Sequence, residues 1–209
     1  PKPQNPLLKT SQLMRIKRGK RYRRIVQHFK VVFKFKPPYR VMVDGGFLHY
    51  AVKNGDFDLR GNLSKIIQDA PLLTMTKCLM REIEDLAHDN RGNRTLKETL
   101  MKAKLIHKAP CKHTGGVIDP DECIMHFVAN RNEEKVFVGT QDYKLKNRLR
   151  NLGSVPVFFF QQQVLVMDTP AEAFEQKMAL KEKLKLEPTV HEKAFLKSQT
   201  EIIARVKEQ

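Results

Sequence analysis

The chain has 209 residues, which is enough for one full α/β domain with extensions and for a core that needs no disulfides. Its longest apolar run, residues 155–160, is only strand-sized, so we expect no membrane span, and the basic first thirty residues lack the apolar core of a secretion signal. Three cysteines, an odd number, argue against a disulfide framework and favour a reducing compartment inside the cell.

The positive charge is concentrated at the beginning of the chain. Residues 1–40 contain 13 Lys or Arg and no acidic residue, whereas residues 41–209 contain 26 basic and 23 acidic residues. A cationic first fifth followed by a nearly neutral body predicts a basic arm attached to a globular domain.

The basic arm is expected to cover residues 1–36. After a proline-containing leader, residues 1–13, Tyr22 and Ile25 stand at helical spacing among Arg and Lys residues. Apolar and basic residues then alternate from Val32 to Lys36, and Pro37-Pro38 ends the segment because neither a helix nor a sheet ladder continues easily through two prolines.

Strands and helices alternate through the middle of the chain. We predict strands at 39–43, 72–76, 104–106, 136–139 and 155–160, with helices at 47–53, 59–69, 77–88, 95–103, from 120 onward and at 143–151. This alternation predicts an α/β fold over residues 37–168, with a doubly wound, mostly parallel sheet and helices on both faces. Residues 169–209 are highly charged and are expected to form a helical C-terminal extension, either solvated or laid along a partner.

Acidic residues stand near the ends of the predicted strands, at the edge where an open parallel sheet collects its chemistry. Four carboxylates meeting there would repel one another unless a cation lay among them, and Mg²⁺ or Mn²⁺ suits an all-oxygen site. Paired metal ions of this kind can activate water against a phosphodiester. The four residues in these positions are Asp44, Glu82, Glu122 and Asp142.

The spacing alone does not fix which acids take part. Glu84 and Asp85 are near Glu82, and Asp121 is next to Glu122, so the choice within each group stays open. Acids at strand ends and helix starts also serve as helix caps and as partners of the helix dipole, which is the alternative role.

All three cysteines lie in positions that suit one metal site. Cys111 and His113 form a compact hook, Cys78 lies in the helix after the second strand, and Cys123 lies in the helix after Pro120. A Cys₃His set matches the tetrahedral preference of structural zinc and would tie the loop 107–120 to two helices. The alternative is three buried cysteines without a metal.

The arm has the composition of a nucleic-acid contact. Cations suit a phosphate backbone, and aromatic rings among them, including Phe29, Phe33 and Phe35, suit unstacked bases. The residues expected to bind RNA are Arg15, Lys17, Arg18, Lys20, Arg21, Tyr22, Arg23, Arg24, Lys34 and Lys36. The basic helix that carries Lys144, Lys146, Arg148 and Arg150 could guide RNA towards Asp142.

Seven short motifs together resemble the eukaryotic nucleolar PIN-domain proteins, and most of all the family of the U-three snoRNA-associated protein twenty-three. They cover about residues 14–170 and follow the family's order: MRIKRGKRYRR, FKFKPPYRVMVDGGF, TKCLMREIE, CKH, DPDECI, VGTQDYKL and GSVPVFFF. The sister family of the FAF-copurifying factor is the second choice, because it typically has Asp-Thr-Asn where this chain has Asp44-Gly45-Gly46.

The resemblance implies a PIN-like fold. It also implies that the protein is a ribosome biogenesis factor of the small-subunit processome and is located in the nucleus, within the nucleolus. It implies pre-rRNA, an H/ACA snoRNA and other processome proteins as partners, and no membrane. It also implies structural zinc at Cys78, Cys111, His113 and Cys123, and it maps the acidic Mg or Mn site of PIN nucleases onto Asp44, Glu82, Glu122 and Asp142.

Two departures from the nuclease pattern bear on catalysis. Glu122 stands where PIN nucleases commonly have Asp, and Lys144 stands where active members often have a further acid. We therefore expect a binding factor whose cleavage activity is weak or vestigial, with a metal-dependent endoribonuclease that cuts pre-rRNA as the alternative.

Overall fold

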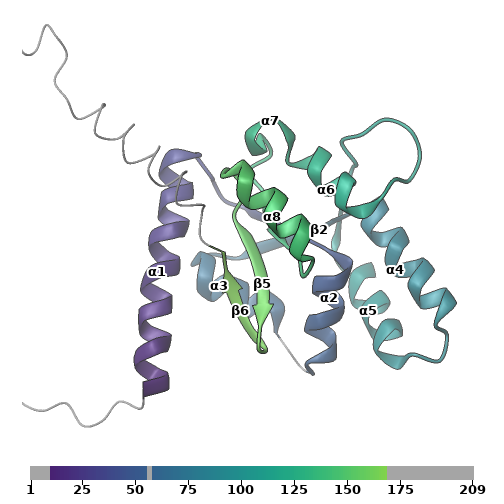
Figure 1. Ribbon diagram of the computed structural model, residues 1–209, viewed down its shortest axis with the longest axis horizontal. Helices are drawn as coiled ribbons and strands as arrows, with labels where there is room; N and C mark the ends of the chain where they lie inside the picture. Colours follow the sequence, from purple (N-terminus) through teal and green to yellow (C-terminus); the bar gives the residue numbers. More distant parts are fainter. Residues whose placement is uncertain (1–9, 56–57, 169–209) are drawn as a thin grey trace, which may run out of the picture. The chain divides into compact units, whose positions relative to one another are not determined.

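A computed structural model describes residues 10–55 and 58–168 (Figure 1), and it describes side chains from Arg18 onward. The strands are β1 (Tyr39–Val43), β2 (Pro71–Thr76), β3 (His107–Ala109), β4 (Phe137–Gly139), β5 (Val157–Gln161) and β6 (Val164–Met167). The helices are α1 (Thr10–Val32), α2 (Gly45–Lys53), α3 (Leu59–Ile67), α4 (Lys77–Asp89), α5 (Arg94–Lys104), α6 (Pro120–Phe127), α7 (Ala129–Asn132) and α8 (Tyr143–Leu152).

The strands form one sheet in the order β3-β2-β1-β4-β5-β6. All neighbouring pairs are parallel except β5 and β6, which form an antiparallel hairpin. From β1 the chain moves outward through β2 to β3, and then returns to β4 on the other side of β1. The order therefore reverses between β1 and β4, and this switch point is where open α/β sheets place their sites.

Helices cover both faces of the sheet, as the alternation of strands and helices predicted. The ring of Phe160 in β5 stacks on Phe47 and Tyr50 of α2. The next side chain along the strand, Phe159, points to the opposite face, where Lys146 of α8 lies 4.2 Å from its ring centroid. The predicted fold class, a doubly wound and mostly parallel sheet with helices on both faces, is confirmed.

The central strands are buried on both faces because helices lie on both. Val41, Met42 and Val43 of β1 and Phe137 of β4 are completely buried. Phe137 stacks on Phe158 of β5 and meets Tyr39 of β1 edge-to-face, so aromatic rings connect three neighbouring strands. This core fixes the positions of the loops that follow β1 and β4.

Local signals define several helix ends. The carboxylate of Asp119 accepts from the backbone N–H groups of Asp121 and Glu122, with Pro120 in the first position of α6. At the C-terminal end of α8, Gly153 stops the helix with a φ of 65°, a left-handed conformation that glycine adopts at little cost.

The basic N-terminal segment is one long helix whose inner face belongs to the core. Tyr22, Ile25, Val26 and Phe29 recur at helical spacing, are all buried, and belong to the same apolar cluster as the strands. Phe35 packs edge-to-face on Phe137 of β4. The boundary predicted at residue 36 therefore cuts through a packed unit, because α1 lies within the compact unit that extends to Thr169.

The structure corrects two further expectations. The third strand was predicted at 104–106 but lies at His107–Ala109, because α5 continues to Lys104. β6 was missed: Gln162 and Gln163 both have positive φ, and the hairpin that they form needs no glycine here. The predicted C-terminal extension, residues 169–209, lies outside the described residues.

No helix among the described residues has both the length and the apolar content that a membrane crossing requires.

Packing of α1 makes a first prediction. Phe29→Ala is expected to lower the free energy of unfolding by about 3–5 kcal/mol, because Phe29 is 1 % exposed and its loss leaves a cavity under α1. Val31→Ala, on the same helix at 66 % exposure, should change it by less than about 0.5 kcal/mol. Urea unfolding followed by circular dichroism measures both, and equal effects would show that α1 does not belong to the folded unit.

Candidate metal centres

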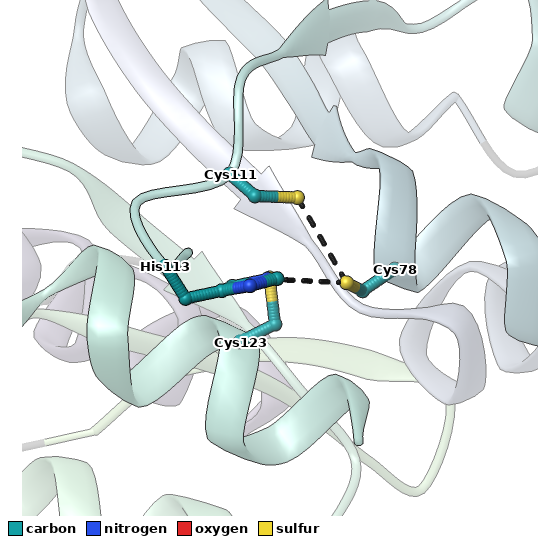
Figure 2. A group of neighbouring side chains, drawn as sticks. All are labelled: Cys78, Cys111, His113 and Cys123. Atoms are coloured by element: carbon teal, nitrogen blue, oxygen red, sulfur yellow. Dashed lines mark hydrogen bonds between the residues drawn. The ribbon is translucent and has the colours of Figure 1, made fainter. Parts of the chain in front are cut away.

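The three cysteines and His113 come together at one point, although the first and the last of them, Cys78 and Cys123, are 45 residues apart in the chain. Cys78 lies at the start of α4, Cys123 lies in α6, and the hook after β3 supplies Cys111 and His113. Their ligand atoms all lie within 4.8 Å of one another, and Figure 2 shows the four side chains pointing at a common centre. This group could hold a metal ion.

The distances within the group fit a tetrahedral ion. Cys78 Sγ lies 3.8 Å from Cys111 Sγ and 3.2 Å from His113 Nε2. Sulfur ligands at about 2.3 Å from a tetrahedral zinc are themselves about 3.8 Å apart. Burial raises the pKa of the Cys123 thiol to about 12, so without a cation this sulfur keeps its proton. Thiolate and imidazole donors, and no carboxylate, select a metal such as zinc.

A salt-bridge network holds the hook in place, and no local pattern in the sequence indicates it. Lys112, between the two hook ligands, donates to Glu134 at 2.6 Å, and Arg40 of β1 reaches the same carboxylate at 2.7 Å. The hydrogen bond from Lys112, and to a smaller extent the one from Arg40, holds the pKa of Glu134 below its ordinary value. The hook is therefore tied to the sheet on one side and to α4 and α6 on the other.

The second centre lies at the switch point between β1 and β4. Asp44 directly follows β1, is buried to 6 % exposure, and accepts a hydrogen bond of 3.0 Å from Thr140 Oγ1. Burial raises the pKa of Asp44 to about 6. Burial, and then the charge of Asp44, raises the pKa of Glu82 to about 7. The two carboxylates therefore share one poorly solvated region.

The sequence spacing left open whether Asp121 or Glu122 lies beside the other acids, and the structure shows how the two differ. Asp121 lies near the other acids, since burial and then the charge of Asp142 raise its pKa. Glu122 turns away and forms a two-pronged ion pair with Arg148 of α8, at 2.7 and 3.1 Å. The group at the switch point is thus Asp44, Glu82, Asp121 and Asp142, and the expected place of Glu122 is taken by its neighbour.

Thr140 connects the acids on β1 and β4, and it was not singled out from the sequence. Its hydroxyl donates to Asp44 and accepts from the backbone N–H of Asp142 at 3.0 Å. Asp142 in turn caps α8, because its Oδ1 accepts from the N–H groups of Lys144 and Leu145. Only the position of Thr140 two residues before Asp142, in a buried strand end, could have suggested this role.

Gly45 lets Glu82 approach Asp44. A Cβ at Gly45 would lie 2.8 Å from Glu82 Oε2 and 3.2 Å from Ile83 Cγ1, so a side chain there would push the carboxylate away. Glu82 Oε2 is buried, and among the described residues it has no hydrogen-bond partner. A buried acceptor without a donor, next to a second buried carboxylate, fits a site for a hard cation such as Mg²⁺ or Mn²⁺.

The expected RNA-binding residues divide between the two faces of α1. Arg18, Lys20, Arg21, Arg23 and Arg24 are exposed on the outer face, and Lys34 and Lys36 are exposed after the helix. Tyr22 is 8 % exposed and faces the core, so its ring is not at the surface to meet a base, and the same holds for Phe29 and Phe35. Arg15 and Lys17 belong to the part of α1 whose side chains lie outside the described residues.

A doubly wound sheet of this order, with acidic residues at the switch point, is the arrangement of a PIN-type domain. A solved structure described as the PIN domain endonuclease Utp24 resembles this chain with a TM-score of 0.54, covering 64% of this chain and 93% of its own. The two sequences are 24% identical, so the likeness concerns the fold.

The sequence profile of the Fcf1 family matches residues 65–169, which is half of the chain, and the chain belongs to this family. It is 28% identical to the rRNA-processing protein utp23 of Schizosaccharomyces pombe, over 88% of this chain and 68% of that protein. It is 27% identical to the human rRNA-processing protein FCF1 homolog, over 66% of this chain and 67% of that protein. The resemblance inferred from the motifs is confirmed.

The Cys₃His centre predicts that purified protein contains close to one zinc ion per chain by elemental analysis. Cys123→Ser is expected to lower both the zinc content and the melting temperature, because it removes one of four ligands from a closed site. His126→Ala is the matched control, since the His126 ring lies near His113 but outside the ligand group. Full zinc content in the Cys123 variant would contradict the ligand assignment.

The buried charge of Asp44 predicts a stability that depends on pH. Its pKa is about 6 in the folded protein and 3.8 ordinarily, so the folded state binds the proton more tightly and wild-type stability falls as pH rises from about 4 to 6. With zinc present but without Mg²⁺ or Mn²⁺, Asp44→Asn should exceed wild type in free energy of unfolding by up to about 3 kcal/mol at pH 7.5.

This advantage should shrink to about half at pH 5, because the wild-type carboxyl is then largely protonated in the folded state. Asp85→Asn, on the exposed side of α4, serves as the control and should show no such trend. An Asp44→Asn variant that is less stable than wild type at pH 7.5 would contradict this prediction. It would mean that the ionised Asp44 carboxylate does not destabilise the fold when no cation is bound.

Proposed function

We propose that this protein is an rRNA-processing factor of the small-subunit processome that binds pre-rRNA, an H/ACA snoRNA or both. Membership of the Fcf1 family and the similarity to the rRNA-processing proteins utp23 and FCF1 homolog support this assignment. The same assignment places the protein in the nucleolus, among the other proteins of the processome.

The observation that carries the proposal is the two-sided character of α1. The inner face is anchored in the core, while Arg18, Lys20, Arg21, Arg23 and Arg24 on the outer face are exposed. Cations fixed on a folded surface lose little freedom on binding, and each phosphate that they neutralise releases counterions. RNA binding in this proposal uses backbone contacts along α1, and base contacts must come from elsewhere.

Helix α8 contributes less charge than its sequence indicates. Arg148 is paired with Glu122, and Arg150 donates to Asp168 at 3.2 Å. The ammonium of Lys146 lies over aromatic rings, which leaves Lys144 as the exposed cation beside Asp142. This distribution supports α1 as the main phosphate contact, with α8 as a smaller one near the acids.

Zinc, in this proposal, has a structural role. Three thiolates and an imidazole leave no open coordination position for a water or a substrate. The ion would join α4, the hook and α6, and these two helices carry Glu82 and Asp121. Zinc would thus stabilise the fold and hold two of the four acids in position.

A metal-dependent endoribonuclease is the second candidate, and the gathering of Asp44, Glu82, Asp121 and Asp142 favours it. Mg²⁺ or Mn²⁺ held by these oxygens would supply Lewis-acid activation of water and charge neutralisation at a phosphodiester. Asp44 and Glu82 would be the buried ligands, with Thr140 fixing the orientation of the Asp44 carboxylate. Asp142 offers one oxygen, since the other caps α8.

RNA binding through α1 predicts a specific salt dependence. Replacing Arg21, Arg23 and Arg24 by Gln should weaken binding to a single-stranded pre-rRNA segment and reduce the slope of log affinity against log salt by about two. The matched control replaces three exposed lysines of α5, Lys97, Lys102 and Lys104, by Gln. Gel shifts at several salt concentrations measure both, and equal losses in the two variants would contradict a specific role for α1.

The nuclease candidate predicts different outcomes for two neighbouring residues. In the presence of Mn²⁺, cleavage of single-stranded RNA should be lost in Asp121→Asn, because this carboxylate lies at the acidic centre. Glu122→Gln should cleave like wild type, since Glu122 pairs with Arg148. Equal nicking by wild type and Asp121→Asn would identify a contaminating nuclease, and the enzyme candidate would then be abandoned.

A further inference from the structure

Tyr143 is a large aromatic side chain held at the surface beside the acidic centre. It directly follows Asp142 in the chain and occupies the first position of α8, where it is 69 % exposed. Among the large apolar side chains that are exposed in the described residues, Tyr143 carries the one aromatic ring, and a ring that solvent reaches is available for stacking.

Helix α8 does not need Tyr143 for its stability. Asp142 caps the start of the helix, Gly153 ends it, and Leu145 and Leu149 are completely buried on its inner face. Tyr143 does not belong to the apolar cluster that forms the core. The packing of the helix therefore places no requirement on a ring at this position.

The surroundings of Tyr143 suit a flat, electron-rich partner with phosphates attached. The ammonium of Lys146 lies 5.2 Å from the centroid of the Tyr143 ring and 4.2 Å from that of Phe159, which is half-buried in β5. The ammonium is attracted to both rings and adds positive potential beside them. Lys144, the next residue along α8, is exposed and adds a second cation.

Tyr143 also lies where a strand would leave the acidic centre. Its backbone is bonded to that of Asp142, which interacts electrostatically with Asp121 and, through Thr140, with Asp44. Adjacent Cα atoms are only about 3.8 Å apart, so the side chain of Tyr143 begins within a few ångströms of Asp142. A phosphate at the acids would therefore bring a neighbouring base to the ring.

We propose that Tyr143, with Lys146 and Phe159, forms a stacking platform for an unpaired base of the RNA strand whose backbone lies at the acidic centre. The platform rests on the proposed RNA-binding function and specifies its substrate class: single-stranded nucleotides at this centre, and not a continuous duplex. Base stacking on an aromatic ring depends little on sequence, because every base has a π-face. Tyr22, Phe29 and Phe35 are buried, so this ring supplies the base contact that α1 does not.

Variants of Tyr143 test the platform in the full-length, zinc-loaded protein. Tyr143→Leu should weaken binding to a 12-nucleotide single-stranded RNA by about tenfold, and Tyr143→Phe should bind like wild type because the ring is kept. Neither should change binding to a duplex of the same strand, whose bases are stacked on one another. Leu105→Ala, at another exposed apolar position, is the matched control and should bind both RNAs like wild type.

A fluorescence measurement tests stacking directly and does not depend on how the Leu variant folds. The chain contains no Trp, so Tyr143→Trp introduces a single reporter. Single-stranded RNA should quench its emission, whereas an oligomer of abasic sugar phosphates should not. Leu105→Trp, the control, should respond to neither.

The outcomes separate the platform from the function on which it rests. Binding of RNA that is unchanged in Tyr143→Leu, or quenching of Tyr143→Trp by the abasic oligomer, would overturn the platform and leave the RNA-binding proposal intact. Failure of the wild-type protein to bind any RNA would overturn both.

Discussion

The meeting of Cys78, Cys111, His113 and Cys123 is the contact on which the rest of the site depends. It joins α4, the hook and α6, three segments that the sheet alone does not bring together at this point. Cys78 precedes Glu82 by one helical turn on α4, and Cys123 follows Asp121 by two residues on α6. Whatever holds the sulfur atoms together therefore also sets the positions of two carboxylates.

The acidic centre has the opposite character, since its members repel one another and are poorly solvated. Burial and mutual charge raise the pKa values of Asp44, Glu82 and Asp121. The fold offsets this cost with a core of completely buried strands, a threonine that orients Asp44, and a glycine that admits Glu82. Such strain at a switch point is typical of a binding or catalytic site, because a cation would relieve it.

The alternation of the first five strands with the longer helices, the cysteine hook and the location of the acids at strand ends could be predicted from the sequence, because they follow local patterns and covalent order. The choice between Asp121 and Glu122 could not, because adjacent residues on a helix point about 100° apart and only the docking of α6 fixes its rotation. For the same reason Tyr22 was expected at the surface: its neighbours are cations, but its own position falls on the buried face of α1.

The central claim is that the sulfur centre holds the acidic centre together. The most direct test compares Mn²⁺ binding to zinc-loaded and to zinc-stripped protein. Binding is measured as the decrease of the electron paramagnetic resonance signal of free Mn²⁺. We expect one or two bound Mn²⁺ ions per chain in the zinc-loaded protein and greatly weakened binding after zinc removal. Equal Mn²⁺ affinity in the two forms, or no Mn²⁺ binding to the zinc-loaded form, would contradict it.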